Sequence, residues 1–187
     1  AAAGKSTMKV HYIDVGQGSA VLVQSGVHFM LIDGGDSDAS SKVVSYLKRQ
    51  KVKKLDYVVV SHYDSDHLNG VVGALNVFKV KRVIAPAYTA DSRVYESYCN
   101  IIAQKKIATT RPKAGKKYKL GKARFTILAP NSSGYVDENN YSIALKLVNG
   151  KNRFVITGDA ETESEYEMVE NGQNLSCDVY MAGHHGS

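Results

Sequence analysis

One run of the sequence joins a strand pattern to a cluster of His and Asp residues: Val58-Val59-Val60-Ser61-His62-Tyr63-Asp64-Ser65-Asp66-His67. Its first part is a continuous apolar run, which is typical of a strand buried on both faces. In an extended segment His62, Asp64 and Asp66 would project to one side, whereas the adjacent Asp66 and His67 diverge. Such a loop can serve two metal positions. We expect it to bind one or two divalent ions, Zn²⁺ or Mn²⁺, because His and Asp suit both.

Two other apolar runs end in residues of the same type. Phe154-Val155-Ile156-Thr157 leads into Gly158-Asp159, and Val179-Tyr180-Met181-Ala182 leads into Gly183-His184-His185. Polar groups at the carboxyl ends of neighbouring buried strands gather at one edge of a sheet, where α/β proteins place their sites. A solvated acidic loop with nearby histidines is the alternative. The presence of three such clusters favours a metal site over this alternative.

Strand and helix patterns alternate along the rest of the chain. We expect strands near residues 10–15, 20–24, 28–33, 55–60, 82–85, 124–128, 142–148, 153–157 and 178–182, and helices after Gly34-Gly35, over 71–78, 92–105 and 161–170. Ser37 or Asp38 is the expected N-cap of the first helix. Because hairpins are mixed with strand–helix units, the pattern predicts an α/β sandwich with mixed sheets. No linker or repeat divides residues 9–187, and residues 1–8 are expected to be a disordered or processed N-terminus.

Composition and charge narrow the class of protein. The 187 residues are 43% hydrophobic and 22% charged, which is ordinary for a globular domain. No run approaches the ~18 apolar residues of a membrane-spanning helix. The net charge of +6 is uneven, since residues 97–136 contain nine basic and no acidic side chains. A polyanion such as nucleic acid could bind there through Lys113, Lys116, Lys117 and Lys119, and a solvated lysine-rich face is the alternative.

The run His62–Gly70 resembles the metal-binding signature of the metallo-β-lactamase superfamily, which usually has His at the position of Asp64. The Asp version is similar to the extracellular hydrolase domain of ComEC-type competence (DNA-uptake) proteins. Further motifs carry this similarity: His11–Gly18, Leu31–Gly35, Asn139–Ser142, Thr157–Asp159 and His184–Ser187. The resemblance implies a four-layer αββα sandwich with mixed sheets, apparently truncated at its C-terminal end.

The resemblance also implies a role for each matching residue. His62 and Asp64 would bind a first metal ion, Asp66 and His67 a second, and Asp159 would bridge the two. Either His184 or His185, with His185 preferred, would complete the second site. Asp33 would orient a ligand loop without binding the metal itself. Asn139 or Asn140 lies near the place of another metal-binding His, and Asn is a weaker ligand. Asp66 or Asp159 would hold the attacking water and accept its proton.

The function implied is that of a metal-dependent hydrolase, a phosphodiesterase or nuclease acting on single-stranded DNA during DNA uptake. The same resemblance implies a secreted or cell-surface location, with a cytoplasmic one left open. One alternative is a metal-dependent hydrolase of another ester, a lactone or a cell-wall phosphodiester. Another is a non-catalytic module that binds DNA or a different polyanion through the lysine-rich stretch.

Overall fold

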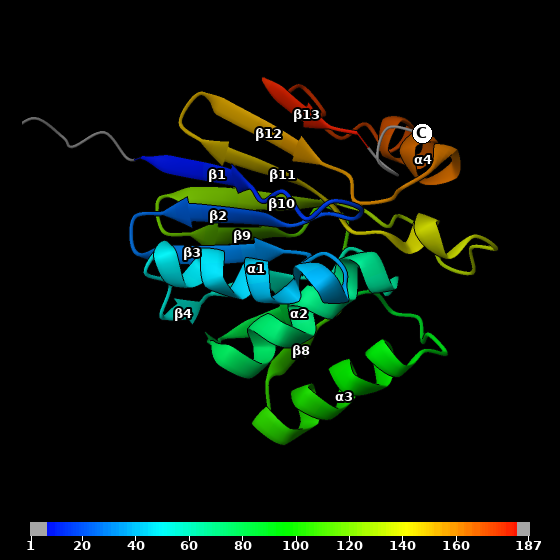
Figure 1. Cartoon of the computed structure of the whole chain (residues 1–187). Helices are drawn as coiled ribbons and strands as arrows, with labels where there is room; N and C mark the ends of the chain where they lie inside the picture. The colour runs from blue at the N-terminus through cyan, green and yellow to red at the C-terminus, as the bar shows by residue number, and fades with distance from the viewer. Residues whose placement is uncertain (1–6, 183–187) are drawn as a thin grey trace, which may run out of the picture.

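Two β-sheets lie face to face, with three helices on one outer side and a single helix on the other (Figure 1). This structure is a computed structural model, and it describes residues 7–182. The expected αββα sandwich with mixed sheets is confirmed. None of the helices in the described range is long and apolar enough to cross a membrane.

The first sheet has the strand order β1-β2-β3-β5-β7-β8. Its strands are β1 (Met8–Tyr12), β2 (Val21–Ser25), β3 (His28–Ile32), β5 (Tyr57–Val59), β7 (Arg82–Ile84) and β8 (Ala108–Thr110). Strands β1, β2 and β3 pair antiparallel in that order, and β3, β5, β7 and β8 pair in parallel. Met8, at the end of the range expected to be disordered, pairs with Ser25.

Three helices connect the parallel strands and cover the outer face of the first sheet (Figure 1). They are α1 (Ser37–Arg49), α2 (Ser65–Val77) and α3 (Arg93–Lys105), and the short strands β4 (Lys54–Leu55) and β6 (Lys79–Val80) pair beside them. The N-cap of α1 is Asp36 instead of Ser37 or Asp38, because the Asp36 carboxylate accepts the Ser37 N–H at 2.5 Å.

The second sheet has the order β13-β12-β11-β10-β9. Its strands are β9 (Lys117–Leu120), β10 (Ala123–Ala129), β11 (Ala144–Asn149), β12 (Asn152–Ile156) and β13 (Val179–Met181). Strands β9 to β12 are antiparallel, whereas β13 runs parallel to β12. A 3-10 helix η1 (Glu138–Tyr141) precedes β11, and α4 (Thr162–Glu170) follows β12.

Alternating side chains of both sheets form the central core. Met30 and Ile32 of the first sheet lie in one apolar cluster with Phe125 and Leu147 of the second. Each such side chain contributes roughly 1.5–3 kcal/mol when fully buried. The opposite faces of the strands pack on helices, so that Val58, for example, joins the cluster beneath α1 and α2. Strand β5 is therefore covered on both sides.

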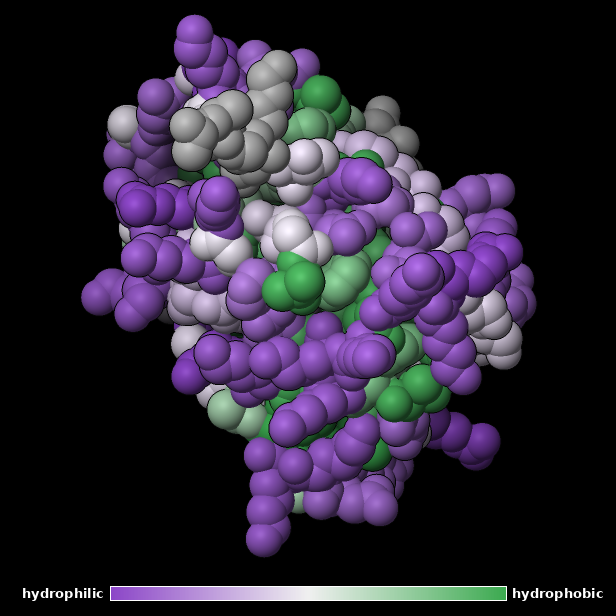
Figure 2. Space-filling model, turned by 90° about the vertical axis from the view of Figure 1, so that its left-hand side faces the viewer, coloured by the Kyte–Doolittle hydropathy of each residue, from purple (hydrophilic) through white to green (hydrophobic). Residues whose placement is uncertain are grey.

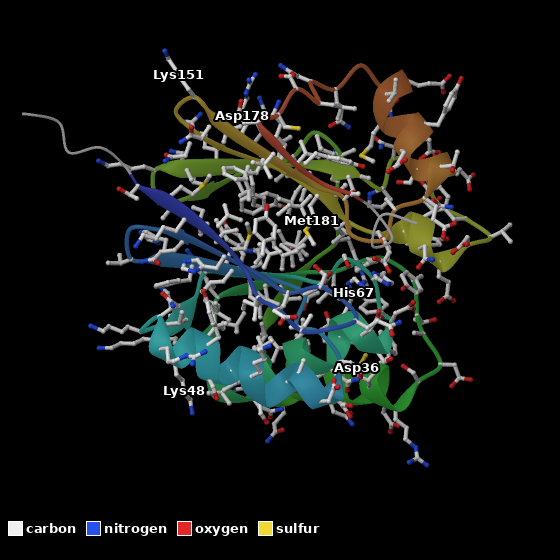
Figure 3. The ribbon with its side chains drawn as sticks, turned by 45° about the horizontal axis from the view of Figure 1, so that its top comes forward. Asp36, Lys48, His67, Lys151, Asp178 and Met181 are labelled. Carbon is white, nitrogen blue, oxygen red and sulfur yellow. The ribbon has the colours of Figure 1, made fainter. Side chains whose placement is uncertain are left out.

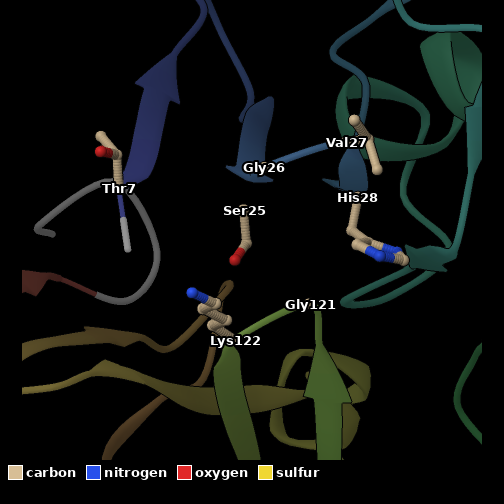
Figure 4. A pocket seen from close by; sticks show the side chains of 7 residues that line it. All are labelled: Thr7, Ser25, Gly26, Val27, His28, Gly121 and Lys122. Atoms are coloured by element: carbon tan, nitrogen blue, oxygen red, sulfur yellow. The ribbon is translucent and has the colours of Figure 1, made fainter. Parts of the chain in front are cut away.

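The two ends of the strands differ in character. We call the end where Asp33, Ser61, Ala85 and Thr157 follow their strands the site edge. The opposite end, with the turns at 26–27, 121–122 and 150–151, we call the hairpin edge. Figure 2 shows a largely hydrophilic surface at the hairpin edge, with only small separate apolar patches. A cavity of about 670 Å³ also opens there, between Ser25, His28 and Lys122 (Figure 4).

Candidate metal centre

The main ligand loop continues the buried strand β5. Val58, Val59 and Val60 are fully buried, and His62 follows two residues after Val60 with no exposed surface. The loop ends at Asp64, the N-cap of α2. Helix α2 therefore begins at Ser65, six residues before the expected start at residue 71. Asp66 and His67 lie in its first turn and not in an extended segment. A carboxylate such as Asp66 is favourable there, because it faces the positive end of the helix dipole.

The side chains of His62, His67 and Asp159 converge at the site edge. Asp159 Oδ2 lies 3.3 Å from His62 Nε2 and 3.3 Å from His67 Nε2. The two imidazole rings are 4.2 Å apart between centroids. Figure 3 shows His67 between the layers of the fold, at the end of the molecule where Asp36 begins α1. Residues almost a hundred positions apart in the sequence thus meet, although β5 and β12 belong to different sheets and are not the neighbouring strands that the strand-end argument supposes.

Asp64 and Asp66 lie beside this group. His62 Nε2 is 3.5 Å from Asp64 Oδ2, and His67 Nε2 is 3.8 Å from Asp66 Oδ2. The possible ligand atoms form two overlapping groups, His62–His67–Asp159 and His62–Asp64–Asp66, each within 4.8 Å. The structure thus brings together five expected ligands, whereas their division between two ions stays a prediction. His184 and His185 lie outside the described residues.

This donor set fits a divalent metal ion. Metal–ligand bonds of about 2.0–2.2 Å in tetrahedral geometry place neighbouring ligand atoms roughly 3.3–3.6 Å apart. The contacts of His62 with Asp159 and Asp64, at 3.3 and 3.5 Å, fall in this range and are longer than a good N–H···O hydrogen bond. Two imidazole nitrogens with carboxylate oxygens suit Zn²⁺ and Mn²⁺. His62, His67 and Asp159 can therefore hold an ion, and the geometry does not choose between the two metals.

Asp33 and Ser61 orient the histidines from behind. Asp33 is 1% exposed, and its Oδ1 accepts the Ser61 N–H at 2.8 Å. Its Oδ2 accepts the Ser61 hydroxyl at 2.5 Å and lies 2.8 Å from His67 Nδ1. The Ser61 hydroxyl also lies 2.9 Å from His62 Nδ1. Because both Nδ1 atoms are engaged here, both Nε2 atoms point toward Asp159.

Sequence reasoning missed Ser61. Strands β3 and β5 pair in parallel with Ile32 beside Val59, so Asp33 and Ser61 leave neighbouring strands at almost the same height. A hydroxyl and a carboxylate at the ends of two adjacent buried strands were a usable signal. However, a single Ser carries no periodicity and resembles any loop residue.

The carboxylates dominate the protonation of the two histidines. Burial lowers the pKa of His62, but contact with Asp159 and Asp64 outweighs burial and raises its pKa to about 9. For His67 burial is likewise outweighed, by Asp33 and Asp159, and its pKa rises to about 10. Burial alone would raise the pKa of Asp159, yet the two imidazoles hold it well below its usual range. Without a metal ion, the centre is thus a cluster of imidazolium and carboxylate groups at neutral pH.

Two glycine contacts bring the parts of the centre together. A Cβ on Gly158 would lie 2.8 Å from Ser61 Cβ, and the residue has φ +57°, so glycine lets Asp159 approach the loop. A Cβ on Gly70 would lie 1.7 Å from the Gly34 carbonyl oxygen. The backbone of the segment that follows β3 is therefore in direct contact with that of α2, which places His67 of α2 next to Asp33.

Tyrosines fix the outer side of the ligand loop. The Tyr63 ring is 3% exposed and packs 4.8 Å from the Tyr88 ring. The Tyr63 N–H donates to the Tyr88 hydroxyl at 2.7 Å, and the Tyr63 hydroxyl donates to the Pro86 carbonyl at 2.8 Å. The loop between β5 and α2 is thus hydrogen-bonded on both sides of His62.

A carboxylate-rich pocket of about 680 Å³ opens onto the centre. Among the described residues that line it, six are acidic and none is basic: Asp36, Asp64, Asp66, Asp91, Glu138 and Asp159. Such a pocket repels an anion until bound cations reverse the local sign. An anionic substrate therefore requires the metal.

Asn139 and Asn140 lie on η1 and contact the start of α4. Asn140 is 4% exposed, and its Oδ1 accepts the backbone N–H groups of Glu161 and Ser164 at 3.2 and 3.3 Å. Asn139 donates through Nδ2 to the Glu161 carboxylate at 3.1 Å. The Asn140 oxygen, the atom that would ligate a metal, is thus engaged by the backbone of α4. A ligand role for either Asn stays a prediction.

The four expected polyanion-binding lysines lie around β9. Lys117 and Lys119 are exposed on the strand, and Lys113 and Lys116 are exposed in the segment before it. Lys116 Nζ lies 5.9 Å from the centre of the Tyr118 ring. These lysines do not line the acidic pocket.

Comparison with known proteins now places this centre in a family. The sequence matches the metallo-beta-lactamase superfamily over residues 13–184. The chain belongs to this superfamily.

Its curated relatives include proteins named for competence. The chain is 29% identical over 199 residues to ComE operon protein 3 of Bacillus subtilis (strain 168), and 31% identical over 176 residues to competence protein ComA of Neisseria gonorrhoeae. These alignments cover 96% and 93% of this chain but 25% and 23% of the relatives. The chain thus spans about a quarter of their length. The expected relation to competence proteins is confirmed.

Solved structures share the fold. A HARLDQ-motif metallo-beta-lactamase from Cronobacter sakazakii superposes with a TM-score of 0.67 at 14% identity, covering 94% of this chain and 74% of that one. The Rm3 metallo-beta-lactamase gives 0.64 at 16% identity, with 94% and 75% covered. At such identities the likeness concerns the fold alone.

Proposed function

We propose that this domain is a metal-dependent phosphodiesterase that cleaves single-stranded DNA. The observation that carries the proposal is the convergence of His62, His67 and Asp159, with both Nε2 atoms 3.3 Å from one carboxylate oxygen. The names of two relatives, a competence protein and a comE operon protein, support DNA as the substrate class of the proposal. The domain would then act where DNA is taken up, at the cell surface or outside the cell.

Metal binding and catalysis would use different features of the same residues. His62, His67 and Asp159 would hold one ion, and Asp64 and Asp66 are placed to share in a second. A divalent ion supplies Lewis-acid polarisation of phosphoryl oxygens and a nucleophile that is available at neutral pH. Asp159 suits a ligand role, because its low pKa keeps it ionised.

Asp66 is the better placed proton acceptor. Its side chain is 17% exposed and lines the pocket, whereas that of Asp159 is 6% exposed. In the proposed reaction water adds to phosphorus and the bond to the leaving oxygen breaks. Asp66 takes the proton of the attacking water, and the leaving oxygen gains a proton from solvent. Because Ser61 and Asp33 engage the Nδ1 atoms of His62 and His67, the Nε2 atoms are the ones that would lose their protons when an ion binds.

The test compares two substitutions in the same pocket. Asp159→Asn should remove most metal binding and lower hydrolysis of a labelled single-stranded oligonucleotide by at least 100-fold. Asp91→Asn lines the pocket but stands outside both ligand groups, and it should keep the wild-type rate within about threefold. Metal content is measured by mass spectrometry on chelator-free protein.

The other readings give different outcomes. Turnover of a lactone or a simple ester without turnover of DNA would indicate a hydrolase of another class. DNA binding that persists in Asp159→Asn, with no hydrolysis by the wild type at any tested metal, would favour a binding module. Equal metal content in both variants and the wild type would refute the site itself.

A further inference from the structure

The outer face of the second sheet is divided into two parts. The part toward the site edge is apolar and is covered by α4, where Leu128, Ala144 and Val155 share a cluster with Met168. The part toward the hairpin edge carries charged side chains. Strand register and alternation decide which side chains point outward there.

Strand β9 presents two lysines on this outer face. Tyr118 points inward, since its ring stacks 5.0 Å from that of Phe125 in the central core, and Leu120 is 1% exposed. Because successive side chains alternate, Lys117 and Lys119 point outward. Both are exposed.

Neighbouring strands add three more cations. Arg124 of β10 stands opposite Lys119, and Lys146 of β11 stands opposite Thr126, which itself faces Lys117. Arg153 of β12 stands opposite Val148, the partner of Arg124. We call these five residues the basic face: Lys117, Lys119, Arg124, Lys146 and Arg153.

No carboxylate balances most of this charge. Strands β9 to β12, all within the described residues, contain no Asp or Glu. Asp178, before β13, pairs with Arg153 at 3.2 Å. Lys119 and Arg124 are like charges directly opposite each other, an arrangement that destabilises a sheet. An anion seated on the face would remove that repulsion.

A hollow in the face offers a place for such an anion. A cavity of about 330 Å³ lies between Lys117, Thr126 and Lys146. Lys146 is only 8% exposed, and its ammonium donates to the Asn174 carbonyl at 2.7 Å, which fixes the charge beside the hollow. Lys119 and Arg124 are exposed on the same face, whereas Arg153 is half-buried.

We propose that the basic face binds the phosphate backbone of single-stranded nucleic acid, as a second contact apart from the metal centre. The choice of a nucleic acid rests on the proposed function, whereas the charge of the ligand rests on the face alone. Arg153, the member of the face on the strand that leads to the metal centre, precedes Asp159 by six residues, which an extended chain spans in roughly 20 Å. A long oligonucleotide can therefore reach both places, and a dinucleotide cannot.

The decisive variant reverses the opposed pair, Lys119→Glu with Arg124→Glu. Both side chains are exposed, so the fold should persist. The matched control is Lys53→Glu with Lys79→Glu, which makes the same change in net charge at exposed positions in and beside the short β4–β6 pair. Binding of a fluorescein-labelled 20-nucleotide oligo-dT is measured in EDTA, where nothing is cleaved, over a range of salt concentrations.

The face variant should weaken binding by at least tenfold and lower the log–log salt slope by about 1–2, since each phosphate contact on a single strand contributes roughly 0.7. The control should change affinity less than threefold. With metal present, the face variant should raise KM for the 20-mer and leave dinucleotide hydrolysis at the wild-type rate.

Wild-type affinity in the face variant, or an equal loss in the control, would overturn the proposal. Tighter binding of a glycerol-phosphate polymer than of DNA with the same number of phosphates would overturn the assignment to nucleic acid. Because binding is measured in EDTA, it is independent of catalysis. A protein that binds DNA through this face but cleaves none would refute the proposed function and leave the basic face standing.

Discussion

Replacement of Asp33 by Asn tests whether the metal centre depends on the hydrogen bonds behind it. Asp33 is not itself a proposed metal ligand, yet it contacts Ser61 and the proposed ligand His67. Its backbone has φ +58°, a left-handed conformation that Asn adopts readily. The substitution therefore removes the charge and replaces one acceptor by a donor without a backbone penalty.

The expected loss follows from the atoms involved. Asn keeps one carbonyl oxygen for the Ser61 N–H, but its NH₂ group replaces the oxygen that faces His67 Nδ1. A donor at that place favours the tautomer with hydrogen on Nε2, the atom that should bind metal. We expect a 10- to 100-fold loss of metal affinity, or about 1.4–2.7 kcal/mol. Two charge-assisted hydrogen bonds are also weakened, so the free energy of unfolding without metal should fall by about 2–4 kcal/mol.

Asp56→Asn supplies the control for this experiment. Asp56 is also a buried aspartate that accepts a backbone N–H, from Phe29 at 3.1 Å, and contacts a histidine, His28, at 3.3 Å. It lies away from the ligand groups. Zn²⁺ and Mn²⁺ affinity is measured by competition with a chromogenic chelator, and stability by urea unfolding in EDTA. Wild-type metal affinity in Asp33→Asn, or the same loss in Asp56→Asn, would refute the reasoning.

Two further predictions concern packing and protons. Gly70→Ala should lower the free energy of unfolding by at least ~3 kcal/mol, because its Cβ would meet the Gly34 backbone. The control Gly73→Ala would approach the hydroxyl of a flexible serine side chain and should lower it by under ~1 kcal/mol. Urea titrations measure both. At pH 7 metal binding should release about two protons, since pKa values near 9 and 10 keep His62 and His67 protonated in the metal-free protein. Calorimetry in buffers of different ionisation enthalpy measures this release, which should decline as pH rises through 9–10, and no release at pH 7 would contradict it. The raised pKa values also stabilise the metal-free fold most fully below pH 6.5, and that stabilisation should fade over the same rise.

The sequence predicts the centre better than it predicts the element boundaries. A buried apolar run followed by His and Asp identifies a strand end, so the clusters after β5 and β12 are foreseeable. Their meeting is less so, because the two strands belong to different sheets and His62 reaches Asp159 only across the sandwich. The start of α2 is not foreseeable, because its first turn is polar and shows no helical period. The role of Ser61 cannot be predicted from the sequence for a related reason, because it depends on the pairing of β3 with β5, which brings Asp33 next to Ser61.

The lysine-rich stretch shows that residues grouped in the sequence need not form one group in the fold. In the sequence Lys113, Lys116, Lys117 and Lys119 form one group, but strand alternation turns Lys117 and Lys119 outward, whereas Lys116 lies over an aromatic ring. The sheet then joins them to cations more than twenty residues away. The basic face therefore combines cations from four strands, which the order of residues in the sequence does not reveal.

The separation of charge across the fold links the two proposals. Among the described residues, every charged side chain that lines the pocket at the metal centre is a carboxylate. Without metal the pocket therefore repels a phosphate, while the basic face attracts one at any metal concentration. Holding a polymer on the face raises the local concentration of phosphodiester bonds near the centre, and bound cations then admit one bond to it. Chelation should therefore abolish cleavage while leaving most of the affinity for a long strand. If the pocket alone bound DNA, affinity and cleavage would disappear together on chelation.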